Sequence, residues 1–95
     1  MSKPYILNIR RPLGAAWSKS THDSLAAALL VAWRKRQKDF SVGDVTHGGS
    51  VVVGSQLVSQ LIDEMDEVIR AEPKSQPQEA AKMIARRIDE AGGAG

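Results

Sequence analysis

The chain contains 95 residues, of which 42% are hydrophobic and 25% are charged, and it has no cysteine. This length and composition are typical of one folded domain rather than of a disordered chain. The lack of cysteine excludes disulfide frameworks, cysteine-ligated metal sites and cysteine nucleophiles. The longest apolar run covers residues 25–33, and residues 1–4 show no secretory signal, so we expect a cytoplasmic protein with no membrane contact.

Charge is unevenly distributed along the chain. The 13 Lys and Arg residues and the 11 Asp and Glu residues leave a net charge of +2. Residues 1–40 nevertheless carry a net charge of +6, residues 41–72 carry −5 and residues 73–95 carry +1. We therefore expect one basic and one acidic surface, each suited to a partner of the opposite charge.

The N-terminal segment predicts a β-hairpin. Apolar side chains alternate along residues 5–11, which is typical of a half-buried strand. Pro12 and Gly14 then interrupt the pattern, because proline cannot donate to a sheet and both residues favour turns. Residues 16–20 are predicted to return as a short second strand.

The next segment predicts a helix at the centre of the core. Residues 21–24 are a cluster of capping residues, in which Thr21 or Asp23 is expected to accept hydrogen bonds from the first turn. Residues 25–38 follow without glycine or proline, and the first half of this segment is largely apolar.

Residues 40–53 predict a second hairpin. Its turn is expected at residues 47–50, because a Gly-Gly pair tolerates the positive φ angles that tight hairpins require. The valine run at residues 51–53 has no polar alternation. Either one arm is covered on both faces or Val52 is exposed.

Two further helices are predicted. Residues 55–71 have apolar side chains at clear helical spacing, and residues 76–90 follow a capping box at residues 75–78. A narrow stripe in the last helix offers a surface for a homodimer as a further alternative: Ala80, Ile84 and Ile88.

Together these elements predict an α+β fold of order β(β)αββαα. A small antiparallel sheet of three to four strands, in two hairpins, carries helices on one face. We expect a single domain over residues 1–91 and a flexible Gly-rich tail over residues 92–95.

No segment carries a complete motif for catalysis or for binding a cofactor. Residues 49–55 match G-x-x-x-x-G-S, but the P-loop lysine is missing and the spacer has the composition of a strand. His22 and His47 are far apart and have no third ligand at metal spacing. The adjacency of residues 22–24 does not create the geometry of a His-Asp-Ser triad. We therefore predict a non-enzymatic protein with no metal and no cofactor.

The helix predicted over residues 55–71 carries a cluster of carboxylates: Asp63, Glu64, Asp66 and Glu67. Like charges three or four residues apart repel weakly on a helix, and a solvated face is the ordinary explanation. The functional alternative is an anionic surface that mimics nucleic-acid phosphates and docks on an Arg- and Lys-lined site of a protein partner.

A basic cluster is divided between the first hairpin and the end of the first helix. Cations at a helix C-terminus complement the macrodipole, which explains part of the cluster without any function. The functional alternative requires the cations to meet on one face and bind nucleic acid, although no helix-turn-helix, RNP or G-x-x-G motif is present. The cluster consists of Arg10, Arg11, Lys19, Arg34, Arg36 and Lys38.

The two tryptophans have different predicted roles. Trp33 falls on the apolar side of its helix and is expected in the core. Trp17 lies in a loop, where it is either an exposed anchor that stacks on a base or on arginine, or a lid over the core.

In size, segregated charge and lack of a catalytic signature, the chain resembles the small accessory proteins of phages and mobile elements. This is a resemblance of type, and such proteins include anti-CRISPR proteins and other inhibitors of host enzymes. It implies a regulatory protein that covers the surface of a protein partner through its acidic face. The alternative is a small nucleic-acid-binding or transcription-modulating protein that uses its basic face.

Overall fold

The computed structural model describes residues 3–14, 16–72 and 76–90. It contains a four-stranded antiparallel sheet of order β2-β1-β3-β4 and three helices, so the predicted α+β fold is confirmed. The elements along the chain are β1 (Tyr5–Arg10), β2 (Ser18–His22), α1 (Leu25–Gln37), β3 (Ser41–His47), β4 (Ser50–Val53), α2 (Ser55–Ala71) and α3 (Pro77–Glu90).

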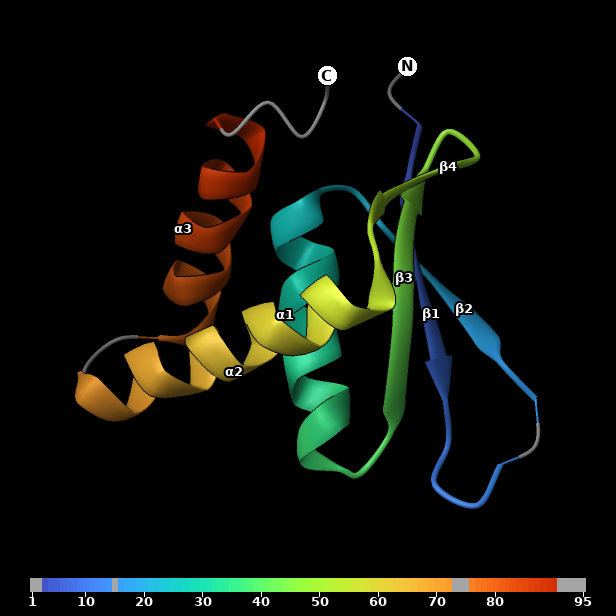
Figure 1. Cartoon of the computed structure of the whole chain (residues 1–95), viewed down its shortest axis with the longest axis horizontal. Coiled ribbons are helices and arrows are strands. Elements are labelled where there is room, and N and C mark those ends of the chain that lie inside the picture. Colours follow the sequence, from blue (N-terminus) through green and yellow to red (C-terminus); the bar gives the residue numbers. More distant parts are fainter. Residues whose placement is uncertain (1–2, 15, 73–75, 91–95) are drawn as a thin grey trace.

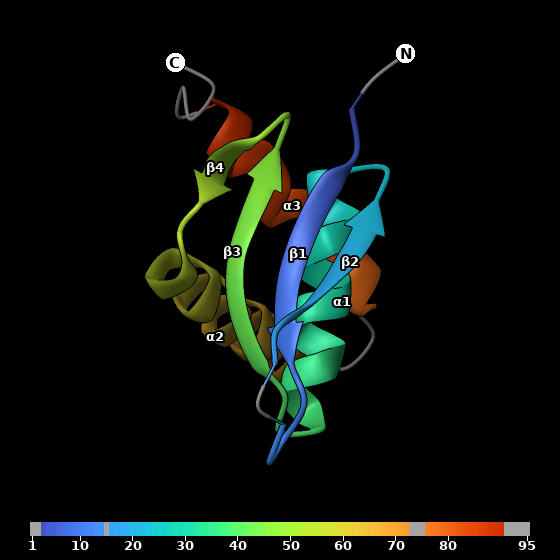
Figure 2. The same ribbon diagram turned by 90° about the vertical axis from the view of Figure 1, so that its right-hand side faces the viewer.

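All three helices lie on one face of the sheet and leave its other face uncovered by helices (Figures 1 and 2). We call this second surface the open face. α1 packs against β1, β2, β3 and both other helices, so it forms the centre of the core. α3 contacts α1 and α2. The open face is thus the side of the sheet opposite the helices.

The alternation in β1 explains which side chains face the helices. Leu7 is fully buried and pairs with Val45 of β3, while Ile9 packs against the core beside Val42. Asn8 is turned to the open face, where its Nδ2 donates to the backbone oxygen of Asp44 at 3.1 Å. The register between β1 and β3 is irregular at this point, between Leu7 and Ile9.

The core fills the space between the sheet and the helix layer. The apolar stripe of α3 faces inward, which removes the basis for the predicted homodimer through that stripe: Ala80 and Ile84 are buried and Ile88 is half-buried. The largest fully buried side chains are Leu7, Leu29, Met65, Ile84, Val45, Val53 and Val58.

The second hairpin forms as predicted, with φ angles of 62° at Gly48 and 85° at Gly49. The valine run matches neither of the two expected arrangements, because Val51 is exposed and Val52 is not. A register shift in the β3–β4 pairing leaves Val51 at 57% exposure and makes Val52 half-buried. The extra residue of the bulge thus explains why the run lacks alternation.

Two local predictions were wrong in detail. The second strand covers Ser18–His22 rather than residues 16–20, because its pairing with β1 decides its bounds. The N-cap of α1 is Ser24, whose Oγ accepts from the amide of Ala27 at 3.1 Å, and neither Thr21 nor Asp23 has this role. Thr21 belongs to β2 and pairs with β1.

The bounds of α2 agree with the prediction, and α3 begins one residue later than expected. The first residue of the predicted capping box, Ser75, and the predicted tail over residues 92–95 lie outside the described residues. Within the described ranges, none of the helices is long and apolar enough to cross a membrane.

Candidate functional site

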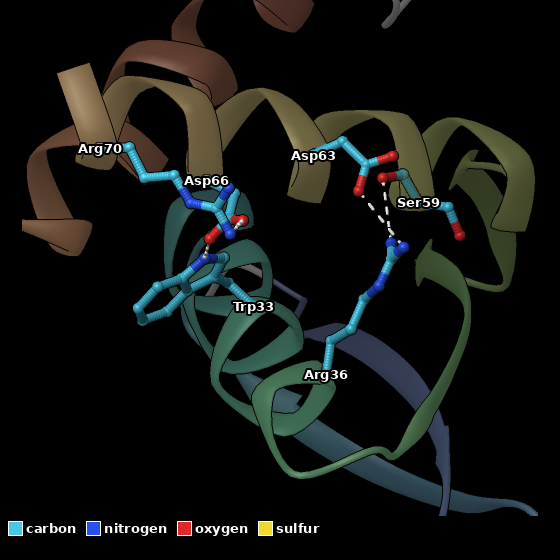
Figure 3. A network of polar contacts seen from close by, with 6 residues as sticks. All are labelled: Trp33, Arg36, Ser59, Asp63, Asp66 and Arg70. Carbon is cyan, nitrogen blue, oxygen red and sulfur yellow. Dashed lines mark hydrogen bonds and ion pairs between the residues drawn. The ribbon is translucent and has the colours of Figure 1, made fainter.

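The acidic cluster of α2 is largely occupied by contacts within the protein. Asp63 Oδ1 lies 3.2 Å from Arg36 Nη2, and the same guanidinium donates through Nη1 to the backbone oxygen of Ser59 at 3.2 Å (Figure 3). Glu64 pairs with Arg87 of α3 at 3.1 Å. These contacts fasten α2 to both neighbouring helices.

Asp66 contacts both α1, through Trp33, and its own helix, through Arg70. Its Oδ1 accepts from Trp33 Nε1 at 3.3 Å and its Oδ2 pairs with Arg70 Nη2 at 3.1 Å (Figure 3). Trp33 is half-buried between α1 and α2, so its indole has a structural partner. Of the four predicted acidic residues, only Glu67 has no ion pair among the described residues. Three of the four predicted acidic side chains are therefore paired within the protein, at positions that remain accessible to solvent.

The segments that carry the basic cluster meet at one end of the molecule. The end of β1, the start of β2 and the last turn of α1 lie together there (Figures 1 and 2). The sheet separates them: Lys19 pairs in register with Asn8 on the open face, whereas α1 lies on the helix side. Arg36 points to α2, and Lys35 lies over the ring of Phe40 at 4.9 Å. The predicted single basic face is therefore divided into two parts.

The cations of the first hairpin form no ion pair with the part of the chain that the structure describes. Within the described ranges, no carboxylate lies at ion-pair distance from Arg10, Arg11 or Lys19. The same holds for Arg34 and Lys38 at the end of α1. Of the six residues of the basic cluster, Arg36 alone thus has a carboxylate partner among the described residues.

Trp17 lies against the open face, on the side of the sheet opposite the core. A Cβ atom built on Gly43 would be 3.1 Å from Trp17 Cζ3 and 3.3 Å from the Cβ of Asn8. The Cζ atom of Arg10 lies over the indole, 5.1 Å from the ring centroid. The side chain is still 49% exposed. The indole therefore does not lie over the core as a lid, and its role as an anchor stays a prediction.

A hollow of about 370 Å³ opens beside this indole. Its wall at the start of α2 is fixed, because Asp44 Oδ1 accepts from the backbone amide of Ser55 at 2.6 Å. The N-cap residue of α2 is Gly54, which has no side chain to accept a hydrogen bond, and the carboxylate of Asp44 in β3 takes this role. The lining residues are Asn8, Trp17, Val42, Gly43, Asp44 and Ser55.

Of the residues that line this hollow, the sequence predicted a binding role in a partner contact only for Trp17. Gly43 had a usable signal, since glycine inside a strand often marks a close approach of another group. The contacts of Asp44 with Ser55 and of Asn8 with β3 join residues that are distant in the sequence, so a local pattern does not reveal them.

The two histidines lie away from the hollow. His22 Nε2 is 2.7 Å from Ser20 Oγ; burial lowers the pKa of His22, and the charge of Asp23 opposes this shift. The ring of His47 stacks on Tyr5, with centroids 4.1 Å apart. Among the described residues, no three His, Asp or Glu side chains are grouped to hold a metal ion.

Comparisons with protein-family models, with curated proteins and with solved structures gave no match to this chain.

Proposed function

We propose that the protein is a non-enzymatic binding protein that binds nucleic acid at the open face of its sheet. The observation that carries this proposal is the half-exposed indole of Trp17, held over Gly43 with Arg10 at 5.1 Å from its ring centroid. An exposed aromatic ring beside arginine and lysine is the combination with which many proteins hold bases and phosphates together.

The distribution of ion pairs supports the same choice. The first 40 residues carry a net charge of +6, and of their cations only Arg36 forms an ion pair within the described residues. On α2, in contrast, Asp63, Glu64 and Asp66 are paired internally. On the open face, a phosphate backbone meets Arg10 and Lys19, and neither of them forms an ion pair within the described residues.

The hypothesis of an acidic inhibitor of a protein partner has less support. A basic partner that docked on α2 would compete with Arg36 and Arg87 for the carboxylates of Asp63 and Glu64. Only Glu67 offers a carboxylate without such competition among the described residues. Under our proposal, Glu67→Lys leaves ligand binding at the open face unchanged, whereas the inhibitor hypothesis predicts a loss of partner capture.

The proposal is tested with two double variants that remove the same charge from different surfaces. Arg11→Ser with Lys19→Ser removes two cations of the first hairpin, and Lys82→Ser with Arg86→Ser removes two exposed cations of α3. Binding to a labelled oligonucleotide of roughly 12 nucleotides, within the range of known site sizes, is measured by fluorescence anisotropy at several salt concentrations.

We expect tight binding at about 50 mM salt and a linear fall of log affinity with log salt. The slope is expected to shrink by about 1.4 for a single strand when two phosphate contacts are lost in the hairpin variant. The α3 variant is expected to keep the slope of the unaltered protein. Equal losses in both variants, or no binding at low salt, would contradict the proposal.

A further inference from the structure

We infer that the hollow beside Trp17 receives one unpaired base of a single-stranded nucleic acid. This inference rests on the proposed function and adds the strandedness of the ligand and the position of one base. The binding site is formed by Asn8, Trp17, Gly43 and Asp44, with Arg10 and Lys19 near it on the open face.

The aromatic contact requires an unpaired base. A base stacks on an indole or on the plane of a guanidinium through its flat face, and in a duplex both faces of each base are covered by its neighbours. The Arg10 guanidinium lies over the Trp17 ring, 5.1 Å from its centroid, so this stacked pair offers the outer plane of the guanidinium and the exposed part of the half-exposed indole. A strand with free bases can use this surface, whereas a duplex presents mainly its phosphates to it.

The charge inside the hollow favours a base over a phosphate. The Asp44 carboxylate lies in the lining and repels phosphate, while Arg10 and Lys19 are placed to bind the backbone. Oδ1 of Asp44 accepts from Ser55, and within the described residues Oδ2 has no hydrogen-bond partner. The pairing edge of every unpaired nucleobase carries at least one N–H group, on the ring or on an exocyclic amine. Asp44 Oδ2 can accept a hydrogen bond from that group.

The position of α1 argues against recognition of a duplex by a helix in the groove. This helix carries the basic last turn, but the sheet, α2 and α3 all pack against it. A recognition helix must enter the major groove with one long side free. The cations at the end of α1 can reach phosphates, but the body of the helix cannot reach base edges.

Gly43 leaves little room beside the indole. A methyl group at this position would lie 3.1 Å from Trp17 Cζ3 and 3.3 Å from the Cβ of Asn8, so these side chains would have to shift by a few tenths of an ångström. Gly43→Ala is therefore expected to weaken binding of a single strand although it removes no charge and no hydrogen-bonding group. This variant therefore tests the effect of the shape of the hollow on binding, separately from the electrostatic attraction between the protein and the nucleic acid.

The experiment compares Trp17→Ala, Trp17→Phe and Gly43→Ala with the unaltered protein. Each is titrated with a mixed-sequence DNA strand of roughly 12 nucleotides, its duplex, and an abasic strand of equal length. Trp17→Ala is expected to weaken binding of the normal strand about 5- to 140-fold, the fold-change that corresponds to one lost base–aromatic stack. Trp17→Phe, which keeps an aromatic ring, is expected to lose much less.

Binding of the duplex and of the abasic strand is expected to be weaker than that of the normal strand and nearly unchanged by Trp17→Ala. The salt slope is also expected to stay constant in this variant, because no phosphate contact is lost. In a Trp33→Phe background Trp17 is the remaining tryptophan, and its fluorescence is expected to be quenched by the normal strand but not by the abasic strand.

The outcomes separate this inference from the proposed function. If the hairpin cations govern binding but Trp17→Ala changes no affinity, or if the duplex binds as tightly as the strand, the inference is wrong and the proposed function stands. If no nucleic acid binds at about 50 mM salt, where phosphate contacts are strong, both are wrong. Thermal unfolding of each variant verifies that the affinities refer to folded protein.

Discussion

The contact between Asp44 and the start of α2 allows a sharp prediction about stability. α2 begins after Gly54, which has no side chain to accept from the first amides, and the carboxylate of Asp44 accepts from Ser55 N at 2.6 Å. Asp44→Ala removes this acceptor and leaves the amide to water. Loss of an N-terminal capping side chain costs about 0.5–2 kcal/mol, and we expect about 1 kcal/mol here.

Two further variants resolve the origin of this loss. Asp44→Asn keeps an oxygen that can accept from Ser55 but removes the charge that interacts with the helix dipole. We expect it to cost about 0.3–1 kcal/mol, and to cost less at high salt. Glu67→Gln removes a carboxylate of the same helix that has no ion pair among the described residues, and it is the matched control, with an expected change within about 0.5 kcal/mol.

Urea unfolding, followed by circular dichroism, gives the free energy of unfolding of each variant. For a domain of this size, a loss of about 1 kcal/mol corresponds to a fall in Tm of about 4–8 °C. The expected order of stability is unaltered protein, then Asp44→Asn, then Asp44→Ala. If Asp44→Ala unfolds at the same urea concentration as the unaltered protein, Asp44 does not cap α2.

Three other predictions follow from single positions. Leu29→Ala, at a fully buried position, is expected to cost about 2–5 kcal/mol in urea unfolding, and a cost below 1 kcal/mol would contradict the proposed core. Leu13→Asn is expected to leave the free energy of unfolding unchanged or to raise it by up to about 1 kcal/mol, because Leu13 is fully exposed and has a φ of 63°, a left-handed conformation that asparagine tolerates better. A clear loss of stability would show that Leu13 has a packing role. Burial lowers the pKa of His22 from 6.5, so the folded state binds a proton at this side chain less readily than the unfolded state; the free energy of unfolding is therefore at its full value above pH 6.5 and falls as the pH drops through the folded-state pKa. His22→Asn is expected to flatten this part of the pH profile of stability, and an unchanged profile would exclude His22 as its source.

The elements that sequence predicted best are those specified by local patterns. α2 has apolar residues at helical spacing and acidic residues on its other side, and its bounds were predicted correctly. The turn at Gly48 and Gly49 was also found, because both residues must adopt positive φ angles there.

The start of the second strand was not found because its residues carry no apolar alternation. β2 is the polar segment Ser18–His22, and its position is set by hydrogen bonds to β1. The N-cap of α1 was ambiguous for a related reason. Several residues before the helix can accept hydrogen bonds, and burial of Leu25 together with the pairing of Thr21 leaves this role to Ser24.

The candidate site shows the limit of sequence reasoning more clearly. The segregation of charge suggested two charged surfaces, with the acidic surface as the first hypothesis and the basic surface as the alternative. The ion pairs Arg36–Asp63 and Arg87–Glu64 join residues that are distant in the sequence, and they occupy carboxylates of the acidic surface. The contact between Trp17 and Gly43 also joins residues that are distant in the sequence. Sequence alone therefore could not decide whether Trp17 is an exposed anchor or a lid over the core.

The most direct test of the central claim, that the open face binds nucleic acid, is a map of the contact surface. Backbone amide shifts of the isotope-labelled protein are recorded by NMR during titration with a single strand of roughly 12 nucleotides. We predict the largest changes at Asn8, Lys19 and Gly43 and at the indole N–H of Trp17, with small changes along the solvent side of α2. Changes centred on Glu67 and its neighbours in α2, with a silent open face, would contradict the account.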